Sequence, residues 1–310
     1  MSVSRARECF VARMHALIDA SQEGALIPQG PISGDRDPSR LMRNGLAVVA
    51  YSSFEDFFAS RTGEVLDAFD ATRVSFDQLP EKLKEAATVG AVRALGFRMN
   101  FEPDASTKRA YVQRHTALIT TTGTSGYKFS PLSFMPSSSN LSDEDIERCL
   151  KALLVEGPWV ELEKITSRIG YGVVGLRQRL KQLAAQRHEA AHAAHADISV
   201  ADLRQFPHDL LAIAAAFDAV FSRAVDEILS RGPLSNSQAK ISAIADSLDL
   251  SFIDYDGKIY SERSEGKDRA RKRYDSLEGA WRGAIGRSAS GKSLLVYRDG
   301  QQRPLDWRMG

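Results

Sequence analysis

The chain has 310 residues, 43% hydrophobic and 26% charged, so it is long and apolar enough to bury a large core in one or two domains without disulfide staples. Its formal net charge of +1 excludes a global field that attracts polyanions, so any nucleic-acid binding must come from local patches. Cys9 and Cys149 are far apart and lack neighbours at metal-ligand spacing, which predicts two free thiols in a reducing, cytoplasmic setting.

The amino-terminal segment predicts a helix over about residues 5–23. Arg5, Arg7, Glu8 and Arg13 interrupt its apolar residues, so it lacks the core of a signal peptide. The most apolar run, residues 45–50, is far shorter than the roughly 20 residues of a membrane span. We therefore expect a cytoplasmic protein that makes no use of a membrane.

Helical patterns then fill the chain to about residue 231, without a convincing alternating strand. Asp37 and Pro38 predict the start of a long helix that ends near residue 70. Ser142 and Asp145 resemble a capping box. Ser199 and Asp202 predict the start of the last helix, although Pro207 allows a later one. The other expected helices cover about residues 80–95, 106–120, 142–155, 159–169 and 173–196, with a loop over 121–140.

The pattern changes after Pro233. Residues 250–260 predict two strands around an Asp-Gly turn, and residues 293–307 predict the same around Asp299 and Gly300. We therefore predict a mainly α protein: a helical bundle over residues 1–232, with its core at about 38–231, and a small α+β appendage over residues 233–310.

Three of the six histidines, His188, His192 and His195, lie within eight residues. On a helix, at about 100° per residue, they share a face about 60° wide, whereas Arg187 points about 140° away from His192. Stacked imidazoles would repel one another when protonated, and imidazole is the side chain best suited to proton transfer at neutral pH. This concentration favours a functional site over a structural one.

One interpretation of these residues is a zinc metallohydrolase. Residues 188–192 spell H-E-x-x-H, in which two imidazoles bind zinc and Glu189 activates water. The chain has no downstream third ligand at the usual spacing and no upstream strand to bind a substrate, and His195 is only three residues past His192. Zinc is therefore an alternative, and we expect neither a metal nor another cofactor.

A second interpretation rests on three ordered segments. Residues 187–192 fit the R-x(4–6)-H signature of the HEPN family, with His188 where Asn is frequent and Ala193 where Gly is frequent. Residues 44–58 resemble the long early helix of RiboL-PSP-type HEPN proteins, which carries an acidic residue at the position of Glu55. Residues 198–229 resemble the closing helix. The chain is thus similar to HEPN endoribonucleases over about residues 38–231.

The resemblance implies a HEPN-type helical bundle that cleaves RNA without metal, leaving a 2′,3′-cyclic phosphate and a 5′-hydroxyl. His192 would activate the 2′-hydroxyl or protonate the leaving oxygen, and Arg187 would stabilise charge on the phosphate. His188, Glu55 and His195 are supporting candidates, with a structural role as the alternative for Glu55. Family members pair two motifs across a homodimer, and the angle between Arg187 and His192 favours the same arrangement.

The family also implies a role in phage defence or as a toxin, with a neutralising or activating protein partner. The rival from another class is a catalytically silent HEPN-like module that binds RNA or protein.

Two further motifs lie in the appendage. Residues 261–310 hold twelve Lys or Arg against seven Asp or Glu, and the tightest cluster is a candidate RNA-binding patch or, alternatively, a solvated face. The cluster consists of Lys267, Arg269, Arg271, Lys272 and Arg273. Residues 286–293 satisfy the P-loop pattern G-x(4)-G-K-[ST], but a helix is expected before them and a strand after them, the reverse of a P-loop. We expect a flexible loop there and no nucleotide.

Overall fold

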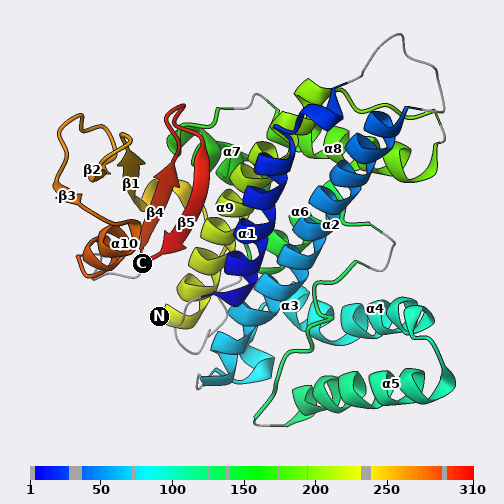
Figure 1. Ribbon diagram of the computed structural model, residues 1–310. Coiled ribbons are helices and arrows are strands. Elements are labelled where there is room, and N and C mark those ends of the chain that lie inside the picture. Colours follow the sequence, from blue (N-terminus) through cyan, green and yellow to red (C-terminus); the bar gives the residue numbers. More distant parts are fainter. Residues whose placement is uncertain are drawn as a thin grey trace. The chain divides into compact units, whose positions relative to one another are not determined.

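The computed structural model shows a mainly helical chain followed by a small sheet, as predicted (Figure 1). It describes residues 4–27, 37–71, 74–124, 126–136, 140–172, 175–193, 195–231, 239–287 and 292–310. Within these ranges, no helix combines the length and the hydropathy that a membrane crossing requires. Both cysteines are free thiols, Cys9 exposed and Cys149 buried, and burial raises the pKa of the Cys149 thiol.

The chain divides into two compact units. The first unit comprises Met1–Phe54, Trp159–Ala219 and Ala243–Gly310, and the second comprises Glu55–Pro158 and Val220–Ser242. Two long helices, α2 (Pro38–Leu66) and α9 (Val200–Ser230), contribute residues to both. The predicted boundary between residues 232 and 233 falls on residues outside the described ranges and stays a prediction.

The helices of the first unit begin where their capping residues predict. The Asp37 carboxylate accepts from the backbone N–H of Ser39 (3.0 Å) at the start of α2, and Ser199 accepts from the N–H of Asp202 (3.0 Å) at the start of α9. Pro207 lies inside α9, so the later start that it allowed is wrong. The remaining helices of the unit are α1 (Arg5–Ala20), α7 (Pro158–Arg168), α8 (Leu176–His192) and α10 (Leu277–Ile285).

The sheet has the strand order β3-β2-β1-β4-β5, and both predicted hairpins are present. β4 runs parallel to β1 because α10 carries the chain across from β3, whereas the other neighbours are antiparallel. The strands are β1 (Asp249–Tyr255), β2 (Tyr260–Ser264), β3 (Lys272–Tyr274), β4 (Ser293–Arg298) and β5 (Pro304–Met309).

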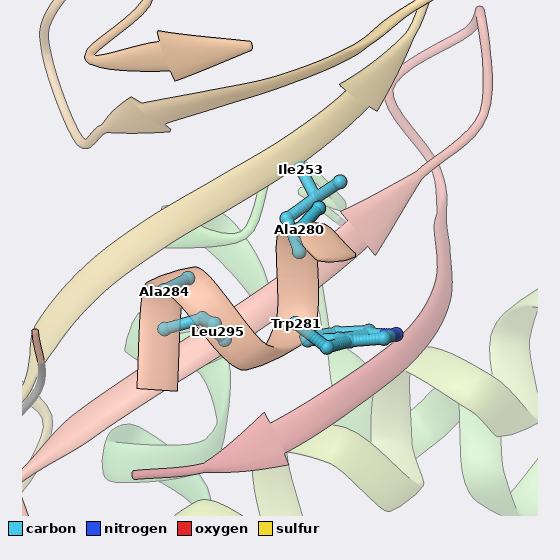
Figure 2. Packing of buried hydrophobic residues seen from close by; sticks show 5 residues of the cluster. All are labelled: Ile253, Ala280, Trp281, Ala284 and Leu295. Atoms are coloured by element: carbon cyan, nitrogen blue, oxygen red, sulfur yellow. The ribbon is translucent and has the colours of Figure 1, made fainter. Parts of the chain in front are cut away.

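Each face of the sheet is anchored by a tryptophan. On one face, Trp281 of α10 and its small neighbours Ala280 and Ala284 pack against Ile253 and Leu295 (Figure 2). Trp307 of β5 pairs with Val296, whose side chain alternates with that of Leu295, and so belongs to the opposite face. Its indole N–H donates to Asp218 of α9 (2.8 Å), and its ring lies 6.3 Å from that of Phe10 in α1. The sheet therefore shares a core with helices of the first unit.

The second unit is built around the remainder of α2 and α9. The predicted helix over residues 80–95 consists of α3 (Glu81–Glu85), a π-helical turn (Ala86–Gly90) and α4 (Ala91–Arg98). The predicted capping box of Ser142 and Asp145 is present and starts α6 (Asp143–Ala152). The other helix of this unit is α5 (Ala105–Thr120).

Candidate active site at the end of α8

The two halves of α8 differ in how they are held. Its buried residues, Leu176, Leu180 and Leu183, all belong to the first half. Arg179 in the same half donates from Nε to Asp209 of α9 (2.8 Å). No residue of α8 after Leu183 is buried. The half that carries the predicted catalytic residues is thus fixed through its helical continuity with a well-packed base.

The structure brings two of the predicted histidines together. His188 and His192 are exposed, and their ring centroids lie 4.8 Å apart, as expected one helical turn apart. The expectation that His195 shares this face is wrong, because α8 ends at His192 and the N–H of Ala193 makes the last helical contact, to Glu189 O (2.8 Å). His195 lies exposed beyond the helix end.

Arg187, which precedes His188 in α8, is partly buried. Its Nε atom and the Oε1 atom of Gln186 are both shielded from solvent and have no hydrogen-bond partner within the described part of the chain. A guanidinium N–H that is shielded from solvent without an acceptor is unfavourable, because it has lost its hydrogen bond to water and has no hydrogen bond within the protein to replace it. An anion or a polar group of a partner would satisfy it.

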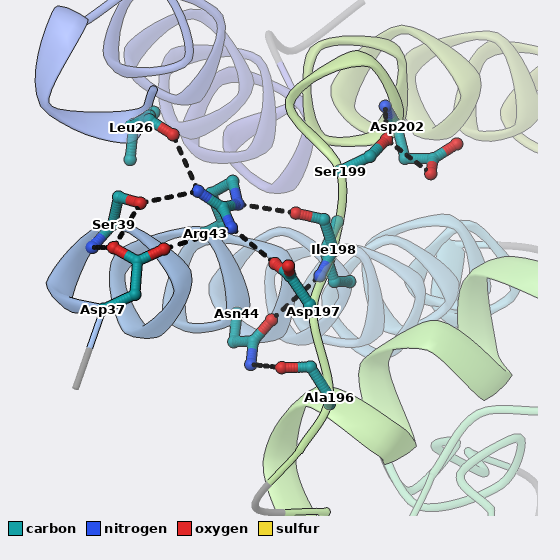
Figure 3. Close-up of polar contacts among 10 residues, drawn as sticks. All are labelled: Leu26, Asp37, Ser39, Arg43, Asn44, Ala196, Asp197, Ile198, Ser199 and Asp202. Carbon is teal, nitrogen blue, oxygen red and sulfur yellow. Dashed lines mark hydrogen bonds and ion pairs between the residues drawn. The ribbon is translucent and has the colours of Figure 1, made fainter. Parts of the chain in front are cut away.

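A buried arginine holds the chain that leaves α8 (Figure 3). Arg43 of α2 is only 2% exposed, and its guanidinium donates to the carbonyl oxygens of Ile198 (2.7 Å) and Leu26 (2.8 Å). It also donates to Ser39 Oγ (2.8 Å) and forms an ion pair with Asp197. One side chain thereby ties the segment after α8 to the start of α2.

Asn44 completes this clamp, which we define as Arg43 and Asn44. Its side-chain amide donates to the carbonyl of Ala196 (2.8 Å) and accepts from the N–H of Ile198 (3.2 Å), so it pairs with the backbone on both sides of Asp197 (Figure 3). Neither clamp residue was predicted as a site residue. Their adjacency at the start of a long helix was visible in the sequence, but their partners in the segment after α8 lie more than 150 positions away.

Glu55 is a predicted supporting residue with a backbone partner of its own. It belongs to the second unit, whereas Arg187 and His192 belong to the first. One Glu55 carboxylate oxygen accepts from the backbone N–H of Leu141 (2.8 Å), directly before the capping box of α6. This contact gives Glu55 a structural partner in its own unit.

The alternative zinc interpretation depends on the positions of the described side chains that could bind a metal. Across the described ranges, no three His, Cys, Asp or Glu side chains are grouped closely enough to share a metal ion. The P-loop pattern is flanked as expected, by α10 before it and β4 after it, while residues 288–291 of the pattern lie outside the described ranges. Arg287, which belongs to this pattern, forms an ion pair with Glu262 of β2.

The five clustered cations all belong to the terminal sheet and its β2–β3 connection. Lys267, Arg269, Arg271, Lys272 and Arg273 are exposed. They are in the same compact unit as α8.

Comparison of the chain with models of known protein families, with curated proteins and with solved structures gives no match.

Proposed function

We propose that the protein is a metal-independent endoribonuclease that works through Arg187 and His192, as its resemblance to the HEPN family implies. The observation that carries the proposal is the end of α8. There the same helix end carries an exposed pair of imidazoles and, at a different angle around the helix, a partly buried arginine whose Nε has no acceptor among the described residues. These are the groups that cleavage of RNA requires: a proton acceptor, a proton donor and a fixed cation.

The reaction is an internal transfer at phosphorus. The ribose 2′-oxygen attacks the phosphorus atom and loses its proton to a neutral imidazole, while the bond to the 5′-oxygen breaks and that oxygen takes up a proton. His192 is the proton acceptor or donor, with His188 adjacent to it, and Arg187 stabilises the negative charge that develops on the phosphate oxygens. The products are a 2′,3′-cyclic phosphate and a 5′-hydroxyl.

The proposed enzyme is a homodimer, because one copy of α8 does not aim both groups at one phosphate. Arg187 and His192 are five residues apart and therefore differ by about 140° around the helix. The end of α8 has no buried residue, which leaves it accessible to a second copy. In the same unit, α2 exposes Leu41 (61%), Met42 (48%) and Val49 (52%), an apolar surface suited to a contact between copies.

The test is RNA cleavage in EDTA by the wild type, Arg187→Ala and His192→Ala, with the exposed α8 residue Gln182→Ala as the matched control. We expect the control to cleave normally and both variants to lose at least about a hundredfold. Mapping of the cleaved ends should show the cyclic phosphate. Activity that EDTA abolishes and zinc restores would instead support the metallohydrolase, and a wild type that binds RNA without cleaving it would support the silent module.

A mixing experiment tests the composite site. Arg187→Ala and His192→Ala copies, each inactive alone, are unfolded and refolded together. If each site takes Arg187 from one copy and His192 from the other, every mixed dimer has one intact site of two. Random pairing makes about half of the dimers mixed, so about a quarter of wild-type activity should return. No recovery in verified mixed dimers would contradict a shared site.

A further inference from the structure

A row of tyrosines crosses the terminal sheet next to α10. In the strand register, Tyr255 of β1 pairs with Tyr260 of β2, which pairs with Tyr274 of β3. The rings of Tyr255 and Tyr260 are stacked, with centroids 4.6 Å apart and planes 26° apart. Tyr255 is 40% exposed. The row therefore presents an aromatic ring to solvent at one end, and neighbouring strands about 5 Å apart lead from it to the edge of the sheet.

The edge at the other end of the row is basic. β3 is the outermost strand on its side of the sheet, and Lys272 and Arg273 lie on it. Together with Lys267, Arg269 and Arg271 they form five exposed cations, none of which makes an ion pair within the described ranges. The ammonium of Lys272 lies 5.4 Å from the centre of the Tyr274 ring. Cations and aromatic rings thus meet on one strand.

Contacts with neighbouring side chains and with α10 hold the row of tyrosines in place. The Tyr274 hydroxyl donates to Glu262 (2.9 Å), and Arg287 contacts both groups. A side chain at Gly283 of α10 would collide with the Tyr274 ring and hydroxyl, so the glycine lets the helix lie against the tyrosine. Tyr260 and Tyr297 also pack against the core formed by α10 and the sheet. Such support fixes the ring positions before any ligand arrives.

We infer that this surface binds single-stranded RNA, with a base stacked on Tyr255 and the phosphates along the cations of β3 and the β2–β3 connection. The inference rests on the proposed function and assigns a substrate contact to the terminal sheet in addition to α8. Unpaired bases present their faces to an aromatic ring, whereas the bases of a duplex do not. Five cations without ion-pair partners in the described ranges match the repeated negative charge of a strand.

The experiment measures binding, separately from cleavage, by using the full chain with His192→Ala. The probe is a short fluorescein-labelled oligoadenylate, followed by fluorescence anisotropy at several salt concentrations. Tyr255→Ser removes the exposed ring and should weaken binding about tenfold, whereas Tyr255→Trp keeps a stacking surface and should bind at least as well as the parent. The same strand annealed to oligouridylate should bind more weakly than the single strand.

A triple variant, in which Ser replaces Arg269, Arg271 and Arg273, tests the contribution of the cations. Binding should weaken and its dependence on salt should fall, by about 0.7 in the logarithmic slope for each phosphate that the protein no longer neutralises. The matched control replaces three exposed arginines of other elements, Arg5, Arg93 and Arg109, by Ser, which changes the net charge equally. It should bind like the parent.

Binding that is unchanged in Tyr255→Ser, or that falls equally in both triple variants, overturns the inference. Equal binding of duplex and single strand does so too. These outcomes are distinct from failure of the proposed function. If the protein never cleaves RNA, yet binds it less tightly only when this surface is altered, the surface binds RNA as inferred and the proposed nuclease function is wrong.

Discussion

Two polar regions of the first unit use similar side chains in opposite ways. At the end of α8, Arg187, His188 and His192 face solvent in whole or in part. Within α9, His208 and Asp209 are buried, 3% and 2% exposed. The same unit therefore contains exposed histidines that a ligand can reach and a buried histidine that it cannot, and the difference between them is burial.

The buried region is a network centred on Asp209. Its carboxylate accepts from the Tyr171 hydroxyl (2.7 Å) and from Arg179 Nε (2.8 Å). Burial, and then the Asp209 charge, raise the pKa of Tyr171 far above its usual value. Burial and then Arg303 lower the pKa of His208 to about 4, so this imidazole is neutral at physiological pH. The contacts of Asp209 with Tyr171 and Arg179 stabilise the fold, whereas the histidines at the end of α8 are exposed and accessible to a ligand.

The largest expected effect on stability follows from breaking the network. Asp209→Ala leaves the Arg179 charge and the Tyr171 hydroxyl without their partner, which should lower the free energy of unfolding by about 3 to 5 kcal/mol. Urea denaturation measures it, with the exposed Glu189→Ala of α8 as control. A decrease below about 1 kcal/mol would show that the network contributes little.

The second effect depends on pH. Because the pKa of folded His208 is about 4, below the ordinary value of 6.5, the unfolded chain binds the proton more readily. The stabilisation is complete above about pH 6.5 and disappears as the pH falls toward 4, a change that reaches about 3 kcal/mol.

This change should be smaller in His208→Gln, and the comparison of the two proteins by urea denaturation removes the contribution of other groups. Parallel pH profiles would contradict the assignment. The charged or titratable groups that act on His208 are Arg303, Asp299, Asp209 and His15.

The clamp should give an intermediate effect that links stability to activity. Asn44→Ala removes two hydrogen bonds to the backbone of Ala196 and Ile198, and should cost about 2 kcal/mol in unfolding free energy. The exposed Asn100→Ala should cost almost nothing. If the segment after α8 positions His192, RNA cleavage should also fall in Asn44→Ala under conditions where the variant is fully folded. Normal cleavage would show that the clamp acts on stability alone.

The smallest change in stability is expected where the largest change in activity is proposed. His188→Ala and His192→Ala remove exposed side chains, so the free energy of unfolding should stay within about 0.5 kcal/mol of the wild type. Thermal unfolding measures it. A decrease above about 2 kcal/mol in His192→Ala would place this histidine with the structural group instead.

The sequence by itself determined the elements whose signals are local. Capping residues such as Ser142 and Ser199 located helix starts, and the Asp-Gly turns located two hairpins, because these contacts join residues a few positions apart. The exposed pair of His188 and His192 was also predictable, since its spacing is one helical turn.

Only the tertiary structure decided the rest. It ended α8 at His192 and so separated His195, gave Glu55 a backbone partner, and supplied the clamp of Arg43 and Asn44. Leu141 lies 86 positions from Glu55, and the segment after α8 lies more than 150 positions from the clamp, so no local pattern encodes these contacts. Sheet order is the same kind of property, because β4 joins β1 only after α10 has carried the chain across.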